Sequence, residues 1–185
     1  KKGNKRHKKL GMIYVYGMTT IFLTAIPLSL LGEFNSFLFV IAIFSFYLAF
    51  AGYRQGRDRS GAREQIDKVL GLFITATGIL FYAMAVGAYL IEDSTWIPSV
   101  LFGTIALIFG INDFRRMKIL DRPNFYDRTS LHLNLMLGGT IATTTAFIVT
   151  IEPFSTFWLN WVAPTIVLTP VIGYFSKREL AKKIN

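Results

Sequence analysis

The sequence predicts an all-α protein: a polytopic membrane helical bundle with six transmembrane helices arranged as three hairpins. Of the 185 residues, 52% are apolar and only 17% are charged, whereas soluble domains carry about 25% charged residues. The apolar residues gather in long runs, and all 20 Lys and Arg residues lie outside those runs. We therefore expect a single integral membrane domain over residues 1–185 rather than a soluble helical core.

Each expected span is an apolar run close to the length that a bilayer requires. A transmembrane helix needs about 20 mostly apolar residues, with a range of about 17 to 25. The fourth run is at the short end of this range. In chain order the predicted spans are Leu10–Leu31, Ser36–Tyr53, Val69–Ile91, Ile97–Asn112, Leu131–Ile151 and Phe157–Phe175.

The connections between the spans alternate in charge. Basic residues fill both termini and the second and fourth connections, so the positive-inside rule predicts six crossings with both termini in the cytoplasm. The net charge of +9 then reflects topology and attraction to anionic lipids at the cytoplasmic face, and nucleic-acid binding is not expected. The other side carries only four charged residues, all acidic: Glu33, Glu92, Asp93 and Glu152.

Small residues at a spacing of three or four predict close contacts between helices, because they let two backbones approach. Such stripes occur on the third, fourth and fifth spans, which we expect to form the tight centre of the bundle. The stripe residues are Gly71, Thr75 and Gly78 on the third span, Gly103, Ala106 and Gly110 on the fourth, and Gly138, Gly139, Ala142 and Thr143 on the fifth.

Two histidines are the candidate cofactor ligands. His7 precedes the first span and His132 begins the fifth, so both imidazoles are expected at similar depth near the cytoplasmic face. Imidazole ligates both haem iron and metal ions, and two ligands must reach a common point. Met136, one helical turn beyond His132, is a third candidate on the same face. These residues predict a shared haem b or metal site.

Other chemistry is not indicated. The chain has no Cys, which excludes disulfides, thiolate nucleophiles and iron–sulfur clusters. No phosphate-binding glycine loop, nucleophile elbow or paired carboxylates are evident, so an enzyme is not favoured. No span has an ionisable residue near its centre, which disfavours a carrier. Asp113, at the end of the fourth span, should be neutralised by Arg115, Arg116 or the outer nitrogen of His132.

Two blocks of the sequence follow a known pattern. The first contains Lys2-Gly3, His7-Lys8, Gly11, Tyr14 and Met18, and the second runs from His132 through Met136-Leu137-Gly138 to Thr145-Ala146-Phe147. Together they resemble a family of uncharacterised bacterial multi-pass membrane proteins, a domain of unknown function. Lys8 stands where that family usually has Arg. The resemblance supplies no activity, but it implies that the histidines have a role and that a seventh helix lies upstream.

These observations favour a non-enzymatic integral membrane protein that packs with protein partners as an accessory subunit of a membrane complex. The alternative is an electron-transfer protein associated with haem or quinone, which uses His7 and His132. A small-molecule channel or carrier is the third class considered.

Overall fold

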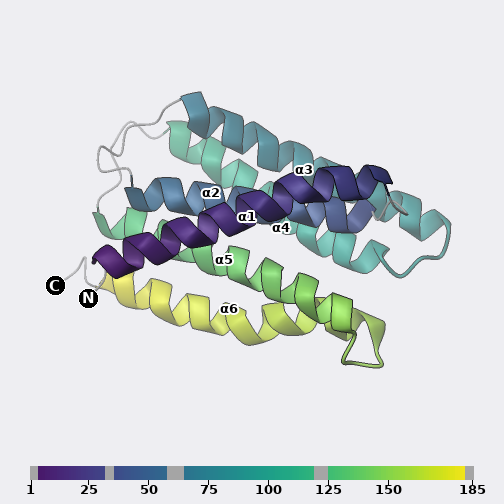
Figure 1. The fold of residues 1–185 in the computed structure, drawn as a ribbon. Coiled ribbons are helices and arrows are strands. Elements are labelled where there is room, and N and C mark those ends of the chain that lie inside the picture. Colours follow the sequence, from purple (N-terminus) through teal and green to yellow (C-terminus); the bar gives the residue numbers. More distant parts are fainter. Residues whose placement is uncertain (1–3, 32–35, 58–64, 119–124, 182–185) are drawn as a thin grey trace.

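The computed structural model describes residues 4–31, 36–57, 65–118 and 125–181, and these segments form six long α-helices. The helices run antiparallel in succession, and both chain termini lie at the same end of the bundle (Figure 1). Lys2 and Gly3 of the first sequence block and Glu33 of the first connection lie outside the described residues. The helices are α1 Lys5–Leu31, α2 Ser36–Arg57, α3 Gln65–Leu90, α4 Trp96–Lys118, α5 Phe125–Ile151 and α6 Phe157–Ala181.

Among the described residues, five helices are long and apolar enough to cross a membrane, so the chain is an integral membrane protein with an all-α fold. The sequence predicted six such spans, and the helix outside this set is α2. The side chains of its first three residues lie outside the described residues, so the predicted span Ser36–Tyr53 stays a prediction. The five spanning segments are Lys5–Leu28, Gln65–Leu90, Trp96–Met117, Asp127–Ile151 and Phe157–Arg178.

Several helices extend beyond their predicted apolar runs at the end of the bundle that holds the termini. α1 begins at Lys5 rather than Leu10, and α4 continues to Lys118 rather than ending at Asn112. Extending an existing helix is much easier than nucleating one, so the helical backbone continues through polar residues. These extensions bring His7 and Asp113 inside regular helices, where their positions are fixed.

The glycine stripes of α3 and α4 face each other, and these two helices form the most extensive pair in the bundle. A Cβ atom added to Gly78 would lie 2.9 Å from the Leu107 side chain and 3.1 Å from the Leu107 backbone nitrogen. A Cβ on Gly103 would lie 3.2 Å from the Gly78 carbonyl oxygen, and Gly110 lies directly against Thr75. The hairpin therefore depends on the absence of side chains at these positions.

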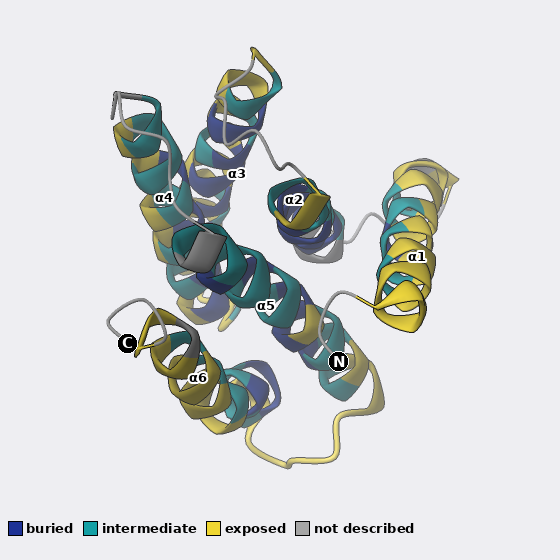
Figure 2. Cartoon of the chain, turned by 90° about the vertical axis from the view of Figure 1, so that its left-hand side faces the viewer, coloured by how far each residue is buried: buried dark blue, intermediate teal, exposed yellow. Residues whose placement is uncertain are grey.

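The centre of the bundle is α2, so the prediction that the third, fourth and fifth spans form it is wrong. α2 contacts α1, α3 and α5, and it is largely buried between them (Figure 2). Its Tyr47 and Leu48 are at most 1% exposed. α5 packs against α2 and α6: Gly138 and Gly139 face Leu48, and Ala142 is buried. Lipid is as apolar as a helix core, so hydrophobicity does not distinguish a central helix from a peripheral one.

Candidate functional site

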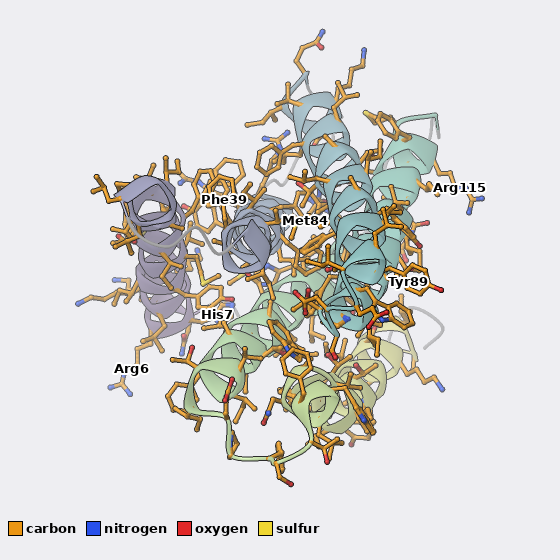
Figure 3. All side chains as sticks on the ribbon, turned by 90° about the vertical axis from the view of Figure 1, so that its right-hand side faces the viewer. Arg6, His7, Phe39, Met84, Tyr89 and Arg115 are labelled. Atoms are coloured by element: carbon orange, nitrogen blue, oxygen red, sulfur yellow. The ribbon has the colours of Figure 1, made fainter. Side chains whose placement is uncertain are left out.

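The structure brings the two histidines together. Their ring centroids are 6.1 Å apart and the ring planes are inclined at 83°. His7 lies in the first turn of α1, where the Asn4 side chain caps the helix by accepting a 2.8 Å hydrogen bond from the His7 backbone N–H. Figure 3 shows His7 on the side of α1 that faces α5, whereas Arg6 points away from the bundle.

The histidine pair belongs to a longer parallel alignment of α1 with α5. The Thr143 hydroxyl lies 3.4 Å from the Met18 sulfur, and these residues are 125 apart in the chain. His7 and His132 are also 125 residues apart, and so are Tyr14 and Gly139. The Tyr14 hydroxyl lies directly over Gly139. α1 packs closely only on α2 within the described residues. Side chains, rather than close backbone contact, therefore bridge α1 and α5.

A hydrogen bond fixes the chemical state of the His132 ring. Its Nδ1 lies 2.6 Å from the Gly52 carbonyl oxygen of α2. A carbonyl oxygen can only accept, so Nδ1 is the donor, and in the neutral ring Nε2 then holds the free lone pair. This arrangement, in which one ring nitrogen is oriented by a backbone carbonyl, is the usual support for a metal-ligating histidine.

Two glycines of α2 form the surface on which α5 rests. A Cβ on Gly56 would lie 2.7 Å from His132 Nδ1, and a Cβ on Gly52 would lie 3.0 Å from both the Cγ and Sδ atoms of Met136. The Met136 thioether therefore lies against α2. The sequence analysis did not assign these glycines a role, although their spacing of four residues is the known signal for close helix approach.

The ring separation fits two ligands on opposite sides of one metal. A metal–imidazole bond is about 2.0 Å long and the ring centre lies roughly 1 Å further, so opposed imidazoles have centroids about 6 Å apart. Tetrahedral ligation would bring the centroids to about 5 Å. The observed 6.1 Å is closer to the opposed arrangement.

The surroundings fit a haem better than a bare metal ion. Among the described residues, no group of three or more His, Cys, Asp or Glu side chains could hold a metal, whereas a porphyrin supplies four ligands itself. Gly11, one turn after His7, leaves open space, since an added Cβ would meet nothing within 4 Å. The exposed basic residues flanking His7 would repel a cation and attract haem carboxylates; they are Lys5, Arg6, Lys8 and Lys9.

Asp113 has a partner that the sequence analysis did not anticipate. Its Oδ2 accepts a 2.6 Å hydrogen bond from the hydroxyl of Tyr47 on α2. Its Oδ1 lies 3.4 Å from Arg116, one of the three expected partners, while His132 bonds to Gly52 instead. Asp113 and Tyr47 are 66 residues apart, and no local pattern connects them.

No protein-family model matches the chain, and neither a curated protein nor a solved structure is similar to it. The resemblance inferred from the His7 and His132 blocks therefore stays a prediction. The functional argument rests on the geometry of the chain itself.

Proposed function

We propose that this protein is a membrane haem protein that transfers single electrons, with the haem iron held between His7 and His132. The observation that carries this proposal is the pair of imidazoles at 6.1 Å, with the Nδ1 atom of His132 bonded to Gly52. His7 and His132 would hold the haem, which would supply one-electron redox chemistry at this site. Such a site suits electron transfer rather than catalysis.

The proposed orientation puts this site at the cytoplasmic face. Six crossings, with both termini in the cytoplasm of a bacterial inner membrane, place all basic connections on one side as the positive-inside rule requires. The exposed basic residues around His7 would then contact anionic lipid headgroups as well as the haem carboxylates. The haem would lie between α1 and α5, over Gly11, about 6 Å along the helix from His7.

The test is a reduced-minus-oxidised absorption spectrum of the purified full chain in mild detergent. We expect a sharp α-band that is lost in both His7→Ala and His132→Ala. Met136→Leu should keep the band, because the thioether lies against Gly52. Thr104→Ala is the matched control, because Thr104 bonds to Tyr82 within the α3–α4 hairpin and takes no part in the site.

A featureless spectrum from folded wild-type protein would refute the proposal. The accessory-subunit hypothesis would then be the one to test, by co-purification of partner proteins. A band that survives His132→Ala would also contradict the assignment, because it would place the haem on other residues.

A further inference from the structure

A second polar site lies inside the bundle, apart from the histidines. Tyr47 is fully buried, and its hydroxyl donates a 2.6 Å hydrogen bond to Asp113. A cavity of about 10 Å³ lies beside them, between α2, α3, α4 and α5. Its polar lining residues are Gln55, Asp67, Asp113 and Arg116. A cavity of this size holds about one water, and a buried water needs two to four polar partners.

The two carboxylates at this cavity are held differently. Asp67 forms a two-point, charge-assisted ion pair with Arg54, at 3.0 and 3.1 Å. Asp113 has a shorter hydrogen bond to a neutral phenol and a longer contact, 3.4 Å, to Arg116. The Arg116 side chain is 32% exposed, so water can solvate its charge when Asp113 becomes neutral.

We propose that Asp113 is a proton-exchange site that loads and unloads through a water molecule in this cavity. Among the described residues, the groups that face it include Tyr47 from α2, Arg116 from α4, and Asp67 from α3 with its partner Arg54. On uptake, a hydronium ion gives its proton to Oδ1: an O–H bond forms on the carboxylate, one breaks on the hydronium, and water remains. Tyr47 keeps its own proton and donates to Oδ2 in both states.

The position of the site supports this role. Ionisable groups inside a membrane helix are costly and are used in proton relays. A Cβ on Gly71 would lie 3.4 Å from the Asp113 Cβ, an ordinary van der Waals contact, so α3 packs directly against Asp113. Asp113 lies five residues before the end of α4, about 8 Å along the helix axis, within reach of water from one face.

The experiment uses infrared difference spectra of the full chain in lipid bilayers, between mildly acidic and mildly alkaline buffers. We expect a C=O stretch of a protonated carboxylic acid that disappears in Asp113→Asn and persists in Asp67→Asn. The Asp113→Asn variant should fold, because its side-chain amide oxygen can still accept from Tyr47; circular dichroism checks this. Tyr47→Phe should shift the frequency of the same band, because it removes the hydrogen bond to the carboxyl group.

A water-exchange measurement completes the test. In D₂O the Asp113 band should shift to lower frequency within the time of buffer exchange, because water in the cavity reaches the carboxyl group. Identical pH-difference spectra for wild type and Asp113→Asn would overturn the proposal, as would loss of the band in Asp67→Asn instead. None of these readouts needs a bound haem, so failure here is distinct from failure of the proposed electron-transfer function.

Discussion

Adding one methyl group at Gly56 tests whether α2 positions the His132 ring. The new Cβ would lie 2.7 Å from Nδ1, 2.9 Å from Cε1 and 3.1 Å from Cγ. The ring is rigid and is held by the 2.6 Å bond to Gly52, so it can move only if that bond breaks or the helices separate. Overpacking costs about 1–3 kcal/mol and the lost hydrogen bond about 1 kcal/mol. The gain in helix propensity from Gly to Ala is about 1 kcal/mol.

We therefore expect Gly56→Ala to lower the free energy of unfolding by about 1–3 kcal/mol. Gly87→Ala on α3 is the matched control, because a Cβ there meets nothing within 4 Å; it should gain up to about 1 kcal/mol. Thermal unfolding in mild detergent measures both, at about 2–4 °C per kcal/mol for a chain of this size. Equal melting temperatures for the two variants would refute the idea that the imidazole rests on α2.

Three further changes have defined outcomes in the same thermal assay. Gly78→Ala should cost about 1–3 kcal/mol, because the nearest atoms include the Leu107 backbone nitrogen; no loss would mean that α3 and α4 separate freely. Glu152→Gly should stabilise by about 1 kcal/mol, since Glu152 has a φ of 44° that only glycine adopts without cost; a drop in stability would contradict this. Asn160→Ala should lose about 1–2 kcal/mol, because the Asn160 amide pairs with both backbone groups of Phe154; Asn160→Asp should lose at least as much, because it buries a carboxylate against the Phe154 carbonyl oxygen.

The sequence predicted the parts of the fold that depend on length and composition. All six helices were placed, because a bilayer demands long apolar segments and the charged residues mark their ends. The similar depth of His7 and His132 followed from the direction of α1 and α5, and the rings do meet. Their similar depth places both residues at one level of the bundle. The rings meet because α1 and α5 both pack against α2.

The arrangement of helices within the bundle could not be predicted. Helices in a membrane are apolar on every side, so no polar face marks the surface that packs inward. The burial of α2 was missed for this reason. The contact of Tyr47 with Asp113 was missed because it joins residues on α2 and α4, which belong to different hairpins. The contact of α2 with α5 did carry a sequence signal, in Gly52 and Gly56 on α2 and in Gly138 and Gly139 on α5.

The parallel pairing of α1 with α5 has a consequence for biosynthesis. His7 leaves the ribosome 125 residues before its counterpart, and at about 5–20 residues per second this interval lasts about 6–25 s. Throughout that time the membrane holds an N-terminal helix with half of the proposed ligand pair. A cofactor can be captured between the two imidazoles only after α5 has been inserted, so chain completion and cofactor loading follow a fixed order. Any nascent chain that stops before α5 is therefore unable to retain a haem between these residues.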